Sequence, residues 1–418
     1  MNNLVPNSAT LPTLLCVLAL GCGSSMNAPG VASSGSTGAI AGTDGSAGGS
    51  ENTENGGRPS NVGTSGSGNS SGGSPTAPTP VVLPCPSLKP GEPTWERITP
   101  PGDVGDGQAI RVHPTESGTV FVMMHKGGNG AHYPTDGLYK SQDCGATWSS
   151  LINTGVNGDT VATGSWWSFV IDPIDPNIIY TIDGYGAGGV WKSTNGGVDW
   201  IQTIPTEQGQ YIPNLFLNGL AMDPTDRLHL VATVHDTCTG PAAGGCLPET
   251  FDGGATWHLI KGPDPGWSEG AGPIIIDKKR LFYATGFGGL ALTTDGGVTW
   301  KKVADSGYPS IYAAPDGNFF VTSNNGVLKS SDGLTWSLLP GSGRSVPITG
   351  GDTMLYAADQ WSGAYYVADA ANPSEMRKFT NAGMPESAHG AAFMAYDKAH
   401  SVLYSSNFAG GVWRIVTP

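Results

Sequence analysis

Several side chains that could carry acid–base chemistry lie in polar, Gly-rich stretches between apolar segments. The candidates for proton transfer or nucleophilic attack are His125, His132, Tyr133, Asp136, His235, Asp236 and Glu269. Two carboxylates flanking a glycosidic bond, one with a raised pKa, could hydrolyse it, and Asp159 and Glu386 are further carboxylates for that role. A His or Tyr base (Tyr133 or Tyr211) beside a cation such as Lys126 could instead eliminate across a uronic acid.

A second group of residues could hold a ligand without reacting with it. This group contains Lys126, Trp166, Trp167, Tyr211, Trp267, Trp361 and His389. Exposed Trp rings are suited to stacking on sugar rings or other aromatics. Because Trp166 and Trp167 directly precede an apolar strand, one of the two could instead belong to the core. The sequence requires no cofactor, although the histidines are compatible with a divalent metal.

Composition narrows the class of partner. Only 13% of the 418 residues are Asp, Glu, Lys or Arg, while 64 are Gly and 32 are Pro, as expected for an exported all-β protein with many tight turns. The net charge of -14 argues against nucleic acid, whose phosphates require a basic surface. The same charge argues against direct electrostatic binding to a membrane, so contact with a membrane is expected only through a lipid anchor.

The N-terminal segment indicates export. Residues 1–22 read as a signal peptide, with an apolar run too short to span a bilayer and small residues before Cys22. This ending resembles the lipobox of bacterial lipoproteins, which implies lipidation of Cys22 and a place on the bacterial outer membrane or cell surface. An ordinary cleaved signal and a misassigned start codon are the alternatives. Residues 23–83, rich in Gly, Ser and Thr, are expected to be a disordered linker to a folded domain at 84–418.

Four cysteines remain in the expected domain, an even number for an oxidising compartment. Cys238 and Cys246 flank a short Gly-rich stretch and are expected to close one loop, so Cys85 and Cys144 should pair by elimination. The absence of a C-x-x-C pair argues against a metal site built from these four residues.

One short motif recurs five times along the chain. Its copies, named here the repeated motif, are Ser141-Gln-Asp-Cys-Gly-Ala-Thr-Trp148, Ser193-Thr-Asn-Gly-Gly-Val-Asp-Trp200, Thr250-Phe-Asp-Gly-Gly-Ala-Thr-Trp257, Thr293-Thr-Asp-Gly-Gly-Val-Thr-Trp300 and the shorter Ser330-Ser-Asp-Gly-Leu-Thr-Trp336. The Asp is expected to accept bonds from backbone N–H groups of its own turn, and Gly to supply positive φ. We therefore assign the motif a structural role and no catalysis.

Each motif follows a unit of short strands rich in β-branched and aromatic residues. Units start near Ile110, Phe169, Leu220, Ile274, Ile311, Val346 and Ala391. Seven units of about 48 residues predict a single seven-bladed β-propeller, with six blades as the alternative if the region 349–379 is not a blade. The last unit has three strands, and residues 94–99 are expected to supply the fourth and close the ring.

The repeated motif resembles the Asp-box, and the domain resembles the sialidase-type Asp-box propellers. This superfamily includes sialidases, xyloglucan hydrolases, sortilin-type receptors and a photosystem assembly factor. The resemblance implies that ligands bind the face opposite the motifs, formed by the loops that carry His125, His132, His235 and His389. It also implies that Trp166, Trp167, Trp267 and Trp361 lie on that face.

The resemblance leaves two functions open. A catalytic Asp of the xyloglucan hydrolases lies in the phrase Thr-Asp-Ile-Gly-Gly-Ala-Tyr, and Thr135-Asp136-Gly-Leu-Tyr139 is a shortened version of it. Sialidase activity is not expected, because the chain lacks the Arg triad and Arg344 is the sole Arg assigned to the ligand face. We expect a monomer that binds a polysaccharide or surface glycan and cleaves it as a hydrolase or lyase. The alternative is a non-catalytic glycan- or protein-binding propeller.

Overall fold

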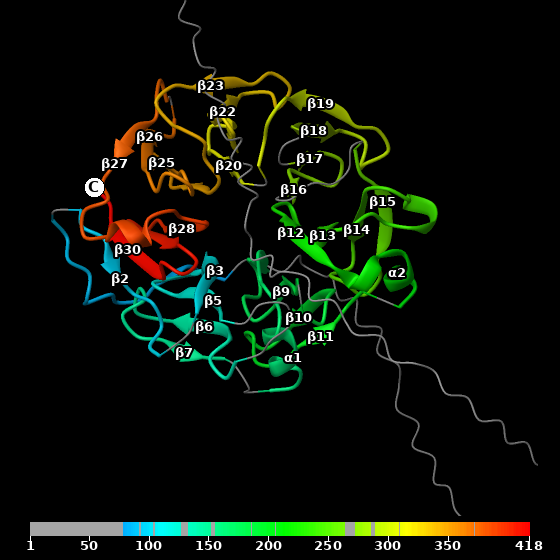
Figure 1. The fold of residues 1–418 in the computed structure, drawn as a ribbon, viewed down its shortest axis with the longest axis horizontal. Coiled ribbons are helices and arrows are strands. Elements are labelled where there is room, and N and C mark those ends of the chain that lie inside the picture. The colour runs from blue at the N-terminus through cyan, green and yellow to red at the C-terminus, as the bar shows by residue number, and fades with distance from the viewer. Residues whose placement is uncertain are drawn as a thin grey trace, which may run out of the picture. The chain divides into compact units, whose positions relative to one another are not determined.

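The computed structural model describes residues 78–418, except Glu92 and residues 103–104, 127–132, 152–154, 185, 205, 264–271, 286–288, 309 and 372. All described residues belong to one compact unit. Their strands form seven four-stranded antiparallel sheets around a common centre, which Figure 1 shows in face view. The predicted seven-bladed propeller is confirmed, and the region 349–379 is a true blade.

The blades follow one another along the chain. Blade one is β3 (Asp106–Val112), β5 (Val120–His125), β6 (Gly137–Ser141) and β7 (Ser149–Ser150); blade two is β8 (Phe169–Ile171), β9 (Ile179–Ile182), β10 (Val190–Ser193) and β11 (Ile201–Gln202); blade three is β12 (Leu217–Asp223), β13 (Asp226–Val234), β14 (Cys246–Thr250) and β15 (His258–Lys261); blade four is β16 (Gly272–Ile275), β17 (Leu281–Ala284), β18 (Leu290–Thr293) and β19 (Lys301–Ala304). Blade five is β20 (Ile311–Ala313), β21 (Phe319–Ser323), β22 (Gly326–Ser330) and β23 (Ser337–Leu339); blade six is β24 (Ile348–Gly350), β25 (Met354–Ala358), β26 (Tyr365–Asp369) and β27 (Arg377–Phe379); blade seven is β28 (Phe393–Asp397), β29 (Val402–Ser406), β30 (Val412–Val416) and β2 (Glu96–Arg97).

Burial differs systematically across a blade. The second strand is buried on both faces in blade one, where every residue of β5 is buried, and in blade four, where the same holds for β17. The outer strands are largely exposed, as in β11 and β19. Second strands therefore read as continuous apolar runs because neighbouring blades cover both of their faces.

The ring is closed by the N-terminal strand, as predicted. β2 pairs antiparallel with β30, with Arg97 opposite Trp413. The buried Arg414 strengthens this junction by donating to the carbonyl of Cys144 at 2.6 Å and to Glu96 Oε2 at 2.9 Å. Closure leaves blade seven complete and removes a free sheet edge.

The repeated motif forms the turn between the third and fourth strands of blades one to five. In blade four, Asp295 Oδ1 accepts from the Thr299 N–H at 2.9 Å, and Thr293 Oγ1 accepts from the Gly297 N–H at 2.9 Å. Gly297 has a φ of 85°, so the expected positive φ is present. The motif Trp also links blades, because Trp300 Nε1 donates to the carbonyl of Lys261 in blade three.

The N-terminal segment is attached to the outside of the ring. β1 (Val81–Val82) pairs in parallel with β4 (Glu116–Ser117), which lies between β3 and β5. Within the described residues, strand pairing thus begins at residue 81, inside the segment 23–83 that was expected to be a linker. Both predicted disulfides, Cys85–Cys144 and Cys238–Cys246, are confirmed.

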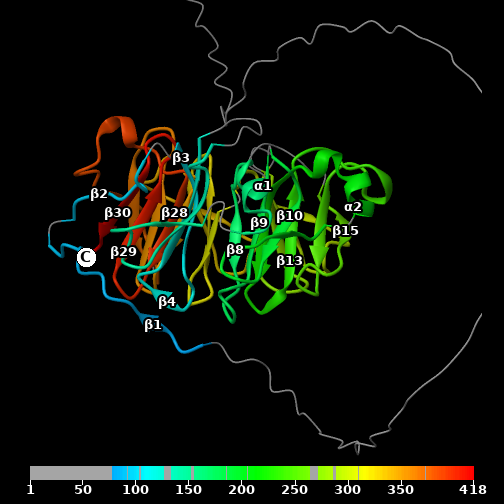
Figure 2. The ribbon, with the colours of Figure 1, turned by 90° about the horizontal axis from the view of Figure 1, so that it is seen from below.

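Two faces of the propeller differ in their loops. The motif face carries the repeated motifs and β4. The loop face carries the connections from second to third strands and from blade to blade, including the short helices α1 (Gly158–Ala162), α2 (Thr206–Tyr211), η1 (Pro213–Leu215), η2 (Gly240–Ala242) and η3 (Glu386–Ala388). Figure 2 shows α1 and α2 on the side away from β1 and β4. Among the described residues, every helix is too short to be a candidate membrane span.

Candidate functional site

The start of the β5–β6 loop gathers several of the predicted residues of blade one. His125 ends β5 and is buried, with Nδ1 3.5 Å from Asp136 Oδ2. Asp136 is fully buried and accepts from the backbone N–H groups of Lys126 at 2.6 Å and Tyr133 at 3.0 Å. Lys126 Nζ lies 5.3 Å from the centre of the exposed Tyr133 ring. Asp106, opposite His125 in β3, has a pKa raised by burial.

These contacts give Asp136 a clear structural role. Its carboxylate fixes both ends of the loop, because Oδ1 accepts from the Lys126 N–H and Oδ2 from the Tyr133 N–H, so both oxygens serve the loop. The described part of this loop places His125, Lys126, Tyr133 and Asp136 together, while His132 lies outside the described residues.

An aromatic group lies where blades two and three meet. The ring of His235 stacks on Phe216 with centroids 3.9 Å apart and lies 6.5 Å from the Trp167 ring. Trp167 is half-buried and touches Gly184, where a Cβ would stand 3.2 Å from its ring. Asp236 is exposed beside His235, with Oδ1 3.5 Å from His235 Nδ1. The predicted residues Trp167, His235 and Asp236 are thus brought together.

A residue that the sequence analysis missed lies next to this group. Asp183 follows β9 directly, has no exposed surface, and accepts from the Ala187 N–H at 2.7 Å through Oδ2. Its Oδ1 has no hydrogen-bond partner among the described residues and lies against Gly164 and Gly186. Burial raises the pKa of Asp183 to about 8, so its carboxyl group is largely protonated at neutral pH.

Asp183 belongs to a set of equivalent positions. The residue at this register, where each second strand ends on the loop face, is polar in every blade: His125, Asp183, His235, Thr285, Asn324, Asp359 and Asn407. A run of five mainly apolar residues followed by a polar one is therefore the sequence signal that could have identified Asp183. The repeated motif does not reveal this position, because the motif lies beyond the opposite ends of the strands.

A second aromatic group lies on the loop face at blades four to seven. Trp361 is 42% exposed in the β25–β26 loop, and the Arg344 guanidinium lies 3.2 Å from the centre of its ring. His389 lies beside this loop, because a Cβ on Gly363 would stand 2.3 Å from its Cβ. His389 Nε2 is 3.1 Å from the carbonyl of Met384.

Other predicted residues are placed elsewhere. Trp166 is only 2% exposed, donates to the carbonyl of Val161 and packs edge-on against Trp200, so it is a core residue and the expectation of ligand stacking was wrong. Tyr211 is half-buried and packs against Gly240, which belongs to the loop that the Cys238–Cys246 disulfide closes. Asp159 and Glu386 are exposed in α1 and η3. Cys22, Trp267 and Glu269 lie outside the described residues.

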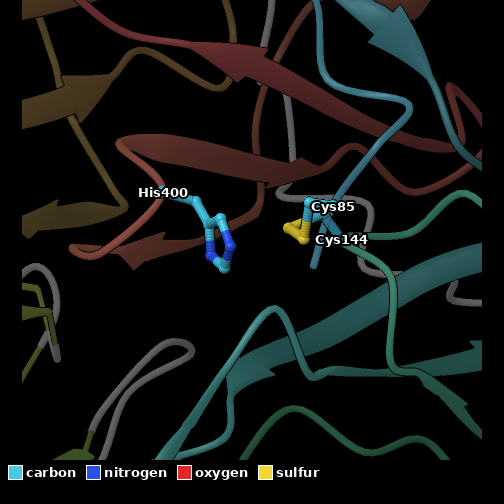
Figure 3. A group of neighbouring side chains, drawn as sticks. All are labelled: Cys85, Cys144 and His400. Atoms are coloured by element: carbon cyan, nitrogen blue, oxygen red, sulfur yellow. A yellow bond between two sulfur atoms is a disulfide. The ribbon is translucent and has the colours of Figure 1, made fainter. Parts of the chain in front are cut away.

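The described residues contain one group with the spacing of metal ligands, formed by Cys85, Cys144 and His400. Figure 3 shows that the two sulfur atoms are bonded to each other beside the His400 ring. His400 contacts Asp397 through Nδ1 at 3.0 Å and the carbonyl of Leu83 through Nε2 at 2.9 Å. Oxidised sulfur and an occupied imidazole make this group a structural clamp for the N-terminal segment, not a metal centre.

Two hollows in the described surface lie away from the loop-face groups. One is on the motif face beneath β1, lined by His113, Glu116 and Lys140 among others. The other lies between β11 and α2 at the edge of blade two. Neither contains a residue predicted to bind a ligand or to react, so the loop face remains the candidate site.

Comparison with known protein sequences finds distant relatives but no family. No protein-family model matches the chain. Over 283 residues the chain is 25% identical to the xyloglucanase Xgh74A of Acetivibrio thermocellus, a match that covers 60% of this chain and 31% of that enzyme. The chain is therefore distantly similar to a xyloglucanase and spans less than a third of its length.

Solved structures show the propeller more completely. The structure of YCF48 bound to a D1 peptide has a TM-score of 0.52 at 14% identity, covering 80% of this chain and 100% of YCF48. An ancestral GH74 enzyme has a TM-score of 0.52 at 15% identity, covering 76% of this chain and 45% of the enzyme. At these identities the likeness establishes the fold alone.

Proposed function

We propose that this protein is an exported carbohydrate-active propeller that binds a polysaccharide on its loop face and hydrolyses it. The distant similarity to a xyloglucanase over 60% of the chain supports the class of ligand. The aromatic group of Trp167, Phe216 and His235 supports sugar binding, because flat rings at a loop face are suited to stacking on the apolar faces of sugars.

The observation that carries the hydrolytic reaction is Asp183. Glycoside hydrolysis needs a carboxyl group that is still protonated at working pH and can donate to the leaving oxygen. Burial gives Asp183 this property. Its Oδ1 lies against Gly164 and Gly186, which have no side chains, so a ligand would have to displace only their backbone to reach this oxygen. The partner carboxylate would come from the loop face, where Asp106 and Asp236 are candidates among the described residues.

A lyase reaction would use different residues of the same face. His125 with Lys126 and Tyr133 offers a base, a cation and a phenol in one loop. Neutralising the uronate there could involve a divalent metal, as proposed for the histidines from the sequence. We rank this reaction second because the distant sequence similarity is to a xyloglucanase, not to a lyase.

A non-catalytic binder is the second candidate function. The burial of Asp136 supports it, since the carboxylate that most resembled a catalytic residue holds a loop. The overlap with the whole YCF48 chain, which was solved with a bound peptide, also supports it. In this case the loop face would recognise a glycan or protein without cleaving it.

Export is part of the proposal. The two disulfides support an oxidising compartment, and the short apolar run before Cys22 supports a lipid-modified N-terminus. The five Ser/Thr-x-Asp/Asn turns support membership of the Asp-box propellers.

A polysaccharide panel tests the reaction, reading reducing ends and the absorbance of unsaturated uronates together. The full chain should release reducing ends without unsaturated product. Asp183→Asn keeps the acceptor for the Ala187 N–H but removes the proton, so it should lower the rate about 10²–10⁴-fold with little change in affinity. Because Asp183 must be protonated to donate, the wild-type rate should fall as pH rises through about 8.

Glu207→Gln is the matched control, because Glu207 is an exposed carboxylate in the loop-face helix α2 that is not a candidate for the reaction, so the variant should leave the rate unchanged. An unchanged rate in Asp183→Asn would remove the proposed proton donor. Unsaturated product would establish the lyase instead. No product from wild type, together with glycan capture, would leave the non-catalytic binder.

A further inference from the structure

The side chain of Arg344 lies against two aromatic rings at the loop face. Its guanidinium lies 3.2 Å from the centre of the Trp361 ring and 5.8 Å from that of Tyr308. Both Nε and Nη2 donate to the Tyr308 hydroxyl, at 3.1 and 2.8 Å. The cation is therefore oriented by its neighbours before any ligand arrives.

The residues that orient Arg344 are themselves fixed. The Tyr308 hydroxyl donates to Asn324 Oδ1 at 2.5 Å, which ties the connection between blades four and five to the end of β21. The Trp361 loop is held by Asp359, whose Oδ1 accepts from the N–H groups of Trp361 at 2.9 Å and Ser362 at 3.1 Å. His389, in the connection between blades six and seven, lies beside the Trp361 loop. Connections of blades four to seven thus meet at one aromatic and cationic surface.

The carboxylate nearest to Trp361 in sequence, Asp359, is already engaged. Asp359 Oδ1 serves the backbone of its loop and Oδ2 accepts from the Ser362 hydroxyl at 2.5 Å. Its charge is thus committed to the loop. At the same time Trp361 retains 42% of its surface in solvent, which a ring with a purely internal role does not need.

We propose that Arg344 and Trp361 form a subsite for a uronic acid residue of an acidic polysaccharide. The indole would stack on the sugar ring, and the guanidinium, weakly hydrated because it lies on aromatic rings, would pair with the sugar carboxylate. This inference rests on the proposed function and specifies its ligand. It concerns binding and holds whether cleavage is hydrolytic or eliminative.

A uronate fits the group better than a simple anion or a neutral sugar. A free anion would use the cation and leave the exposed indole without a role, while a neutral sugar would use the indole alone. A uronic acid presents an apolar ring face and a carboxylate on the same rigid unit. Since the whole chain carries a net charge of -14, an acidic polymer needs such a local cation to overcome the general repulsion.

Binding of polygalacturonate and xyloglucan to the full-length protein by isothermal titration calorimetry tests the subsite. Arg344→Gln should weaken binding of polygalacturonate about tenfold or more, the usual effect of losing a charged hydrogen bond, and change xyloglucan affinity less than about twofold. Arg344→Lys should give most of this loss, because an ammonium cannot pair bidentately. Trp361→Ala should weaken binding of both polymers.

Arg377→Gln is the matched control, because Arg377 is an exposed Arg on the outer strand β27, and it should change neither affinity. Thermal unfolding of each variant verifies folding, and Arg344→Lys keeps the test valid if Arg344→Gln unfolds. Equal losses of affinity for both polymers in Arg344→Gln would overturn the subsite in favour of a packing role. A peptide with a C-terminal carboxylate is titrated as a third ligand, and a loss of affinity for this peptide alone would overturn the subsite in favour of a protein ligand. Xyloglucan binding without polygalacturonate binding in wild type would refute the subsite alone, whereas binding of neither polymer would refute the proposed function itself.

Discussion

Replacing Glu249 with glutamine should lower the free energy of unfolding by about 3–5 kcal/mol, the usual cost of removing one partner from a buried charge pair. Glu249 is buried in β14 and contacts two histidines, His229 Nε2 through Oε1 at 2.8 Å and His258 Nε2 through Oε2 at 2.7 Å. His229 is completely buried, so the variant leaves its charge without one of its two carboxylates.

The network spans the whole of blade three. His229 Nδ1 lies 2.8 Å from Asp223 Oδ2, so the order Asp223, His229, Glu249, His258 crosses β12, β13, β14 and β15 in turn. Phe251 covers it from the turn, stacking on His229 with centroids 4.5 Å apart. A histidine that meets a carboxylate at each nitrogen can satisfy both only as the imidazolium.

The pH dependence of stability follows from two shifted pKa values. Burial alone would lower the pKa of His229, but hydrogen bonds to Glu249 and Asp223 raise it above its ordinary value of 6.5. Its contribution is complete below pH 6.5 and is lost as pH rises through the folded pKa. Burial would likewise raise the pKa of Glu249, but bonds to His229 and His258 lower it below 4.5, so its contribution is complete above pH 4.5 and is lost as pH falls through the folded pKa.

Denaturant unfolding of wild type and Glu249→Gln between pH 3 and 10 measures this effect. The difference between the two proteins should be largest from about pH 4.5 to 6.5 and shrink on both sides. Asp226, which forms an ion pair with Lys278, also interacts with His229 and should be kept intact. Glu207→Gln, an exposed change in α2, is the control and should have no effect. A difference that does not vary with pH would contradict an imidazolium in the network.

The fold could be predicted from the sequence because its determinants are local. Each repeated motif encodes its own turn through an Asp or Asn, a Gly and a Trp, and five copies fix the spacing of the blades. Even the closing strand could be identified, since the last blade had three strands and one matching segment remained. The two disulfides followed from an even count of cysteines.

The site could be predicted only in part, because solvent exposure is set by neighbouring blades. Trp166 and Trp167 are adjacent in sequence, yet Trp166 packs against Trp200 while Trp167 reaches the loop face. Asp136 lies in a segment whose sequence resembles that around a catalytic Asp of the xyloglucan hydrolases, but its carboxylate holds its own loop together. Asp183 has no motif, and its raised pKa arises from burial. None of these environments can be read from local spacing.

The remaining large effect should come from the Cys85–Cys144 disulfide. It joins residues 59 apart, whereas Cys238–Cys246 joins residues 8 apart. The chain-entropy relation gives about 4 kcal/mol for the first and about 2.5 kcal/mol for the second. Removing Cys85–Cys144 also frees the N-terminal segment, which His400 contacts at the carbonyl of Leu83 and which leads into the closing strand β2.

Backbone conformation provides a matched pair of variants for this prediction. Cys144 has a φ of 60° at the motif position where other copies have Gly196, Gly253 and Gly296, with φ of 72°, 67° and 73°. The double variant Cys85→Ala with Cys144→Gly removes the disulfide and relieves this left-handed strain, whereas Cys85→Ala with Cys144→Ala removes the disulfide and keeps the strain. The Ala pair should be less stable than the Gly pair by about 1 kcal/mol.

Unfolding midpoints of the two pairs, and of Cys238→Ala with Cys246→Ala as the short-loop control, separate the contributions. Both variants at Cys85 and Cys144 should unfold before the short-loop variant. A Gly pair as stable as wild type would show that the disulfide mainly offsets the strain at Cys144 and adds nothing to ring closure. A Gly pair well below wild type would show that the covalent link itself holds the N-terminal segment against the ring.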